Sequence, residues 1–370
     1  MAITNFHEFF IQWHLTERCN LSCAHCYQTG GKSAELSLEE IRSVAEEVAE
    51  MLGAWSEAYG ISFSRSVSVT GGEPFLRHDI SEILETIRIK GFDLYLLSNG
   101  TLIDEGRAKM LSRLSMKGVQ ISVEGPENVH DAIRGKGSFS ASMEGIRHLL
   151  DAGLKVTVNA TLSELNSGHL HDLAEIALSL GVQRLGFSRL VPSGRGLGLI
   201  DRMIEREKVR KIYEEIFSLR PAGLEIVTGD PVASQMSCPA GEDAGTVATG
   251  GCAAGLSGLT FLPDGTIVPC RRLFVPIGNV RNDTIREVWA SSPVLEALRD
   301  RTRYKGRCGD CRRWAGCRGC RAIAYAYSSA KGKPDFLSED PQCFIGKEDE
   351  SNGAERQEDV LKKPHKSGSV

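Results

Sequence analysis

The chain has 370 residues and a formal net charge of −4 at pH 7, a length that suits one large α/β domain with a smaller one. Its 41% hydrophobic and 25% charged residues are ordinary for a soluble globular protein, and no global field favours nucleic acid or anionic lipid. No apolar run reaches the ~20 residues of a membrane span, and the first residues lack a secretion signal. We expect a cytoplasmic protein that contacts no membrane.

Strands and helices alternate along the first half of the chain. Strands are expected at residues 9–17, 66–70, 93–98, 119–123, 155–161 and 184–189. Helices are expected between them, at residues 37–58, 79–90, 104–115, 139–152 and 167–180. Strands separated by helices pair in parallel through right-handed crossovers. Both a barrel and an open doubly wound sheet fit this alternation.

Strand polarity favours the barrel. Within residues 119–123 and 155–161, apolar residues alternate with polar ones, whereas strands buried on both faces are apolar throughout. The polar set suggests a lumen that holds a ligand, formed by Gln120, Ser122, Glu124, Thr157, Asn159 and Thr161. We expect a partial (β/α)6 TIM-like barrel with its active site at the C-terminal strand ends, where the sequence places Cys19, Gly71, Asn99, Glu124 and Leu190.

The second half of the chain differs in composition. A glycine-rich exit loop at 190–201 leads to a charged helix at 201–219, and Gly, Cys and Pro become frequent from residue 238. A hairpin turned by Pro-Asp-Gly is expected at 259–268 and a helix at 284–298. The expected units are a barrel at 1–200, a bridging helical region at 201–237, a small cysteine-rich domain at 238–346 and a disordered tail at 347–370.

The 11 cysteines are clustered rather than spread along the chain, which in a large cytosolic chain favours metal binding over disulfides. Cys19, Cys23 and Cys26 form a CxxxCxxC pattern after the first strand. Three thiols on one loop can hold three irons of a [4Fe–4S] cube and leave the fourth iron open for a small molecule. The alternatives are a zinc loop or three unrelated buried thiols.

Together with Gly71-Gly72-Glu73-Pro74 after the second strand, this loop resembles the radical S-adenosylmethionine superfamily over residues 9–200. The resemblance implies that the three cysteines hold a [4Fe–4S] cluster whose free iron is chelated by the amino and carboxylate groups of S-adenosylmethionine. It also implies reductive cleavage to a 5′-deoxyadenosyl radical that abstracts hydrogen from the substrate. An iron–sulfur electron carrier would not need the Gly-Gly-Glu motif.

The resemblance also assigns cofactor contacts. His25 would lie near the adenine, Gly72 and Glu73 would engage the methionine amino group, and Ser122 and Glu124 would contact the ribose or methionine. Ser122 can equally be an ordinary lumen hydroxyl, and Asn99 and Asn159 can cap helices instead of contacting the cofactor. Three more positions at the rim complete the expected cofactor site: Tyr27, Gly71 and Leu190. No catalytic acid or base is named, because Tyr27, His14 and Arg189 can all be structural.

The C-terminal region resembles a SPASM domain, an extension that carries auxiliary iron–sulfur clusters. The resemblance implies an outer cluster on Cys308, Cys311, Cys317 and Cys343 and an inner cluster on Cys252, Cys270 and Cys320. The inner cluster either has an open position or takes Cys238 as its fourth ligand, and Cys238 can instead be a spare buried thiol. Cys317 and Cys320 are separated by two residues rather than the usual three. Three [4Fe–4S] clusters are therefore expected, with a zinc knuckle at residues 308–320 as the alternative.

Nine Lys/Arg and only two acids lie between Arg299 and Arg321. Such a stretch can bind RNA, or its guanidinium groups can offset the negative charge of nearby clusters. Its position among the cysteines favours the second interpretation.

The resemblance leaves the substrate open. Residues 11–19 and Tyr27-Gln28 are similar to peptide maturases, whereas residues 190–196, 319–327 and 338–343 are similar to enzymes that modify iron porphyrin side chains. We expect a radical enzyme that matures a ribosomally made peptide by a thioether or carbon–carbon crosslink, with porphyrin propionate modification as the alternative. A flavodoxin or ferredoxin would supply electrons. Because little chain precedes the first strand, a leader-binding domain would come from a separate partner or would not be needed.

Overall fold

The computed structural model describes residues 6–31, 34–236 and 247–345. Its strands form one ten-stranded sheet in the order β10-β9-β8-β1-β2-β3-β4-β5-β6-β7. The strands are β1 (Phe6–His14), β2 (Ser62–Thr70), β3 (Asp93–Ser98), β4 (Gly118–Ser122), β5 (Val156–Leu162), β6 (Arg184–Arg189), β7 (Glu225–Thr228), β8 (Gly258–Phe261), β9 (Thr266–Val268) and β10 (Gly278–Asn279). β1 to β7 are parallel, and no pairing joins the described strands β7 and β10. The expected partial barrel is confirmed.

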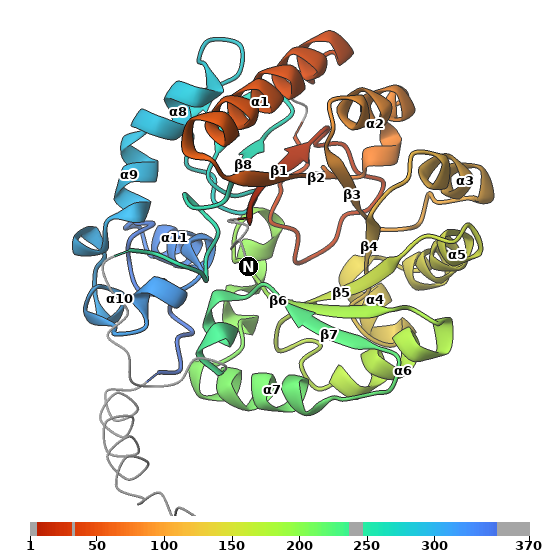
Figure 1. The fold of residues 1–370 in the computed structure, drawn as a ribbon. Coiled ribbons are helices and arrows are strands. Elements are labelled where there is room, and N and C mark those ends of the chain that lie inside the picture. The colour runs from red at the N-terminus through yellow and green to blue at the C-terminus, as the bar shows by residue number, and fades with distance from the viewer. Residues whose placement is uncertain (1–5, 32–33, 237–246, 346–370) are drawn as a thin grey trace, which may run out of the picture.

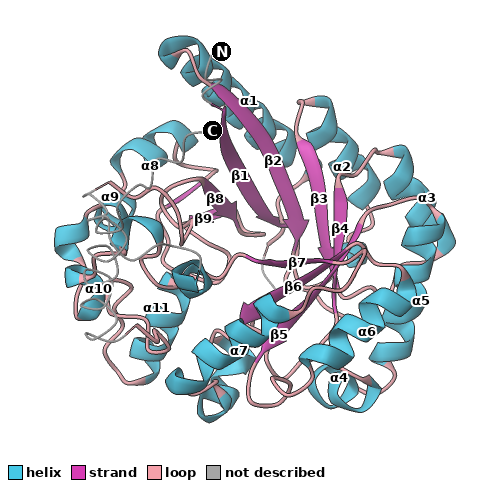
Figure 2. Cartoon of the chain, turned by 60° about the horizontal axis from the view of Figure 1, so that its bottom comes forward, coloured by secondary structure: helices cyan, strands magenta, loops and turns pink. Residues whose placement is uncertain are grey.

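Helices cover the outer side of the curved sheet (Figures 1 and 2). Around the barrel they are α1 (Leu38–Tyr59), α2 (Ile80–Ile89), α3 (Glu105–Arg113), α4 (Glu127–Arg134), α5 (Ser138–Asp151), α6 (Leu170–Leu180) and α7 (Arg206–Ser218). The cysteine-rich part adds α8 (Ile285–Ser291), α9 (Pro293–Arg299), α10 (Arg307–Asp310) and α11 (Arg321–Ala330). None of the helices in the described ranges is long and apolar enough to cross a membrane.

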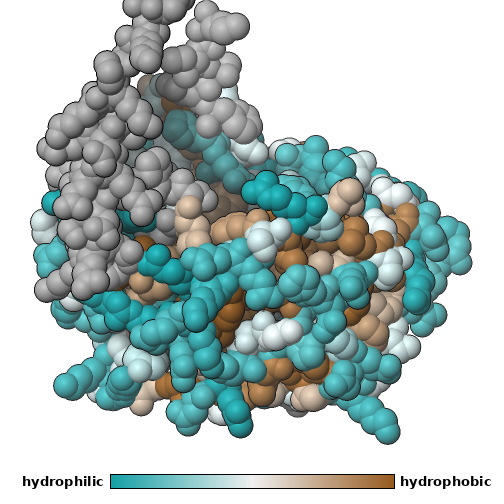
Figure 3. All heavy atoms as spheres, turned by 90° about the horizontal axis from the view of Figure 1, so that it is seen from below, coloured by the Kyte–Doolittle hydropathy of each residue, from teal (hydrophilic) through white to brown (hydrophobic). Residues whose placement is uncertain are grey.

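The alternation seen in the sequence is visible in the burial of the strands. Along β5, Val156 and Val158 are buried beneath the helices, while Thr157 and Asn159 are half-buried on the other face. β4 alternates in the same way. When the molecule is viewed from below relative to Figure 1, its surface shows both hydrophilic and hydrophobic side chains (Figure 3). The apolar residues of the strands therefore form the core between sheet and helices, and the polar ones line the lumen.

Several elements differ from the expectation. The first strand covers 6–14 rather than 9–17, because the chain turns away toward the cysteine loop after His14. The expected helix at 284–298 is two helices, since Pro293 restricts Ser292 to an extended conformation and begins α9. β7, α4 and α11 were not expected. Cys238 and the tail expected at 347–370 lie outside the described residues.

The expected hairpin of β8 and β9 is present, and β8 pairs in parallel with β1. β1 is therefore bonded on one side to β2 and on the other to a strand of the cysteine-rich part. Aromatic contacts reinforce the junction: the ring centroids of Trp13 and Phe261 are 5.3 Å apart, and those of Phe9 and Trp289 are 5.1 Å apart. The sheet thus extends across the boundary expected at residue 238.

Gly258 is the tightest point of this junction. A Cβ atom there would lie 1.9 Å from the carbonyl oxygen of Phe10 in β1. Gly258→Ala is therefore expected to push β8 away from β1 and to lower the free energy of unfolding by about 1–3 kcal/mol, measured by denaturant unfolding. Gly198→Ala is the control, because nothing lies within 4 Å of its added methyl group. Equal stability of the two variants would contradict the pairing.

Candidate functional site

The cysteine loop after β1 is held against the loop after β2 by backbone hydrogen bonds. The N–H of Gly72 donates to the carbonyl of Thr16 at 2.7 Å, and the N–H of Glu73 donates to the carbonyl of Arg18 at 2.8 Å. A Cβ atom on Gly72 would lie 2.2 Å from the Arg18 oxygen, and one on Gly71 would lie 2.6 Å from the Thr16 oxygen. Only glycine permits this approach.

The far side of the cysteine loop is held by the segment after β6 and by α4. The N–H of Gly196 donates to the carbonyl of Cys26 at 2.9 Å, and Arg195 Nε donates to the carbonyl of Cys23 at 3.1 Å. The N–H of Ala24 donates to the carbonyl of Ile133 at 2.8 Å. The three cysteines are thus fixed at the C-terminal strand ends, as expected for an active site of this fold.

Cys19, Cys23 and Cys26 line one cavity with about 1010 Å³ of empty space, open solvent at its mouth included. Burial raises the pKa of Cys19 and of Cys23, which keeps both thiols protonated in the metal-free protein. Seven of the ten expected cofactor-binding residues line this cavity: His25, Tyr27, Gly71, Gly72, Asn99, Ser122 and Asn159. The other three, Glu73, Glu124 and Leu190, do not line it.

Glu73 is fully buried behind the cavity wall. Its carboxylate accepts hydrogen bonds from Ser98 Oγ at 2.9 Å, from the N–H of Asn99 at 2.9 Å and from the N–H of Phe75 at 3.3 Å. Burial raises its pKa to about 7, although these donors act in the opposite direction. At this motif, the glycines line the cavity and the glutamate joins the ends of β2 and β3.

Glu124 is also fully buried and organises a second part of the wall. Arg134 Nε donates to it at 2.9 Å, and His25 Nε2 lies 3.2 Å from the same carboxylate. Burial opposes its ionisation, but the charges of Arg134 and His25 hold its pKa well below the ordinary value. Arg134 also lies 3.8 Å from Cys23 Sγ. Sequence reasoning missed Arg134 because α4 was not expected.

The remaining expected residues occupy different positions. Leu190 is buried, with its N–H bonded to the carbonyl of Leu162. Asn99 Nδ2 lies 3.9 Å from Cys19 Sγ. Asn159 Nδ2 donates to Ser188 Oγ at 3.5 Å, within the lumen wall.

Four auxiliary cysteines have an arginine as a neighbour. Cys270 and Cys320 lie near Arg272, and Cys252 and Cys308 lie near Arg321. Burial alone would lower the pKa of Arg272, and the neighbouring thiols of Cys320 and Cys270 raise it overall. Arg321 Nη2 lies 3.6 Å from Cys308 Sγ. Burial, with smaller contributions from Asp340 and Cys308, raises the pKa of Cys343 to about 11. The assignment of the cysteines to an inner and an outer cluster stays a prediction.

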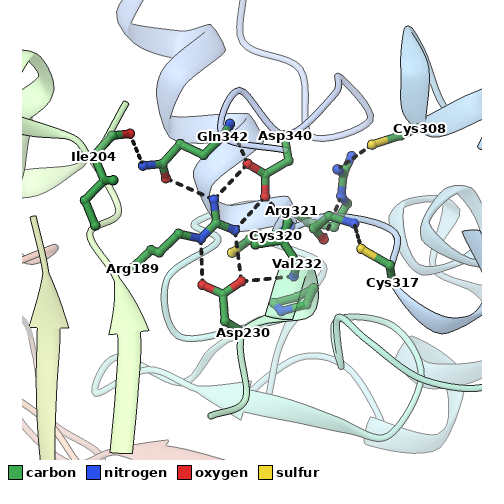
Figure 4. Close-up of polar contacts among 12 residues, drawn as sticks. Arg189, Ile204, Asp230, Val232, Cys308, Cys317, Cys320, Arg321, Asp340 and Gln342 are labelled. Carbon is green, nitrogen blue, oxygen red and sulfur yellow. Dashed lines mark hydrogen bonds and ion pairs between the residues drawn. The ribbon is translucent and has the colours of Figure 1, made fainter. Parts of the chain in front are cut away.

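A buried ion network joins the barrel to the auxiliary cysteines (Figure 4). Arg189, at the end of β6, donates to Asp230 at 2.6 Å and to Asp340 at 2.8 Å, and it also lines the cavity. Asp340 accepts the N–H of Cys320 at 2.8 Å. Gln342 completes the network by accepting from Arg189 at 3.0 Å and donating to the carbonyl of Ile204 at 2.7 Å.

The residues fit the expected groups. Three thiols that line one cavity suit a cube with one open iron, and the polar side chains around them, among them Ser122, Asn99 and Asn159, suit a polar cofactor such as S-adenosylmethionine. His25 Nδ1, Arg318 Nε and Arg318 Nη2 are buried without a hydrogen-bond partner among the described residues. A buried donor without a hydrogen-bond partner destabilises the protein. Arg318 lies between Cys317 and Cys320 in the chain, where an anionic cluster would accept hydrogen bonds from its guanidinium group.

Fold and site together define an α/β enzyme with a cofactor at the C-terminal end of a partial barrel. The model of the radical SAM superfamily matches residues 13–177, and that of the SPASM iron-sulfur cluster-binding domain matches residues 252–320. The chain belongs to the radical SAM superfamily and carries a C-terminal SPASM domain. S-adenosylmethionine and iron–sulfur clusters are its cofactors.

Similar proteins have different named activities. The chain is 30% identical to the AdoMet-dependent heme synthase of Methanosarcina barkeri over 362 residues, 93% of this chain and 98% of that protein. It is 28% identical to the mycofactocin maturase MftC of Mycobacterium tuberculosis over 356 residues, 94% and 85% of the two chains. The fold matches Streptococcus suis SuiB bound to S-adenosylmethionine with a TM-score of 0.72 at 17% identity, over 92% of this chain and 78% of that one.

Asp340→Asn removes one charge from the buried network. Leaving Arg189 with a single carboxylate is expected to cost about 3–5 kcal/mol of unfolding free energy and to lower the iron bound per chain, because Asp340 also holds the N–H of Cys320. Asp93→Asn is the control, since its pair with Lys117 is half-exposed and worth about 0–1 kcal/mol. Unchanged stability and iron content in Asp340→Asn would show that the network does not support the auxiliary site.

Proposed function

We propose that this enzyme matures a ribosomally made peptide by abstracting hydrogen from one of its residues. The observation that carries the proposal is the composition of the cavity wall. The cluster loop of the barrel and Arg271-Arg272 of the SPASM part line the same cavity, and the two arginines directly follow Cys270. A substrate in this cavity would lie between the S-adenosylmethionine site and an auxiliary cluster.

The cavity opens to solvent at its mouth. In the proposed complex, S-adenosylmethionine would lie beside the cysteines and one side chain of an extended peptide would enter from the mouth. MftC, a maturase by its name, covers nearly the whole chain, which supports a peptide substrate.

The chain's own residues would hold and shield the reactants. When bound, the reduced cluster and S-adenosylmethionine supply a 5′-deoxyadenosyl radical. The lumen residues Gln120, Ser122 and Asn159 line the space next to the cysteines and would orient the cofactor and substrate through hydrogen bonds. His25, fixed by Glu124, would place its unpartnered Nδ1 toward a polar group of the cofactor.

We also propose three [4Fe–4S] clusters, on Cys19, Cys23 and Cys26, on Cys252, Cys270 and Cys320 with Cys238, and on Cys308, Cys311, Cys317 and Cys343. The auxiliary clusters would accept an electron from the product radical or bind a substrate thiol. A flavodoxin or ferredoxin would reduce the first cluster, and a separate protein would bind a leader peptide.

Modification of porphyrin propionates is the second candidate. It is favoured by the cationic lining of the cavity, which includes Arg195, Arg271 and Arg272, and by the similarity to AdoMet-dependent heme synthases. Arginine is well suited to binding carboxylates. In this case only the propionate edge of the macrocycle would enter the cavity.

The reconstituted, reduced enzyme is expected to form 5′-deoxyadenosine from S-adenosylmethionine and to change the mass of cysteine-containing peptides encoded beside its gene. Mass spectrometry and chromatography measure both products. Consumption of iron coproporphyrin III without any peptide modification would favour the second candidate and contradict the first.

Simultaneous Cys19→Ala, Cys23→Ala and Cys26→Ala substitution tests the cluster assignment. The variant is expected to lose four of about twelve irons per chain and all 5′-deoxyadenosine formation, while the auxiliary clusters remain. Iron analysis and chromatography measure these results. Retained cleavage would show that another set of cysteines holds the reactive cluster.

A further inference from the structure

We propose that Arg271 is a carboxylate-binding residue that fixes an acidic group of the substrate beside the reacting side chain. The inference deepens the proposed function and rests on it for the nature of the substrate chain. It is drawn from the charges of the cavity wall, where five arginines and one carboxylate are found: Arg134, Arg189, Arg195, Arg271, Arg272 and Glu17.

Two of these arginines have carboxylate partners in the protein. Arg134 pairs with Glu124, and Arg189 pairs with Asp230 and Asp340. Arg134 and Arg189 are therefore neutralised within the wall and have no capacity for a further anion.

Two more arginines have other polar neighbours. Arg272 lies beside the thiols of Cys270 and Cys320 and donates to the carbonyl of Arg189 at 3.3 Å, so cluster thiolates would balance its charge. Arg195 donates to the carbonyls of Cys23 and Thr29, which fixes its guanidinium against the cysteine loop.

Arg271 differs from the others. It forms no hydrogen bond or ion pair with any residue in the described ranges, and its guanidinium carbon lies 5.9 Å from the ring centroid of Tyr27. A cation over an aromatic face keeps its N–H edge free, and that planar edge matches a carboxylate in bidentate fashion.

The neighbours of Arg271 that these contacts name, Tyr27, His14 and Phe274, carry no carboxylate. Tyr27 presents an aromatic ring to the Arg271 guanidinium and carries a hydroxyl group. That hydroxyl lies 3.3 Å from His14 Nε2, and burial followed by the charge of Arg271 lowers the pKa of His14 to about 3. Phe274, whose ring lies 6.3 Å from that of Tyr27, is apolar. The described residues thus supply no carboxylate partner for Arg271.

The cofactors at the first cluster site leave this charge uncompensated as well, and the inner auxiliary cluster proposed on Cys270 and Cys320 would face Arg272. A [4Fe–4S]²⁺ cube on three thiolates carries about one net negative charge, and S-adenosylmethionine carries one net positive charge from its ammonium, sulfonium and carboxylate. Together they are neutral. A substrate anion is the remaining partner, and a carboxylate is the anion that both candidate substrates carry, as an acidic residue of a peptide or as a propionate.

The test uses the cluster-loaded enzyme with S-adenosylmethionine and two pairs of fluorescent probes. One pair is a labelled cysteine-containing pentapeptide with glutamate and the same peptide with glutamine. The other is coproporphyrin III and its tetramethyl ester. Dissociation constants from fluorescence anisotropy are compared for wild type, Arg271→Ala, Arg271→Lys and Arg281→Ala. Arg281 is a matched control because it loses the same charge on the surface, where it pairs with Glu40.

Wild type is expected to bind the acidic member of at least one pair about tenfold more tightly, or ~1.4 kcal/mol. Arg271→Ala should abolish this preference, Arg271→Lys should keep part of it, and Arg281→Ala should keep all of it. An acid preference that survives in Arg271→Ala, or that is absent from wild type with both pairs, would overturn the inference. A preference confined to coproporphyrin would support the carboxylate site while contradicting the peptide proposal.

Discussion

The parallel pairing of β1 with strands on both of its sides is the constraint on which the structure depends. β2 pairs along all nine residues of β1, and β8 pairs with four of them. One side brings the Gly-Gly-Glu loop against the cysteine loop, and the other side holds the hairpin that leads to Cys270. A single strand therefore sets the position of the reactive cysteines relative to both the cofactor loop and an auxiliary site.

Glycines allow the neighbours of β1 to approach it. At Gly72, Gly71 and Gly258, an added Cβ would lie 2.2, 2.6 and 1.9 Å from a backbone oxygen of β1 or of the residues that follow it. These positions demand the absence of a side chain rather than an unusual φ. The motif Gly71-Gly72 is thus structural and functional together: the glycines make the close contact between the loops, and the same glycines line the cavity.

Local patterns account for what the sequence predicted. The sequence predictions that the structure contains rest on properties of short segments. These properties are the spacing of Cys19, Cys23 and Cys26, which line one cavity, the alternation in β4 and β5, and the Pro-Asp-Gly turn of the β8–β9 hairpin. The pairing of β8 with β1 joins residues about 250 apart in the chain, and no local pattern encodes it. Arg134 and Arg271 were missed for the same reason, because their roles depend on which distant groups surround them.

Charge explains why so many arginines are buried around the cysteines. Arg318 is 1% exposed, donates to the carbonyls of Ala254 and Leu298, and lies beside the hydroxyl of Tyr304. A buried guanidinium without a counter-charge is strongly destabilising. The proposed auxiliary clusters would supply such a charge, since a [4Fe–4S]²⁺ cube on four thiolates carries about two negative charges. Arg271 differs from these arginines. The other arginines of the cavity wall have carboxylates, cluster cysteines or backbone carbonyls as partners, whereas Arg271 has no carboxylate partner among the described residues and is proposed to bind a substrate anion.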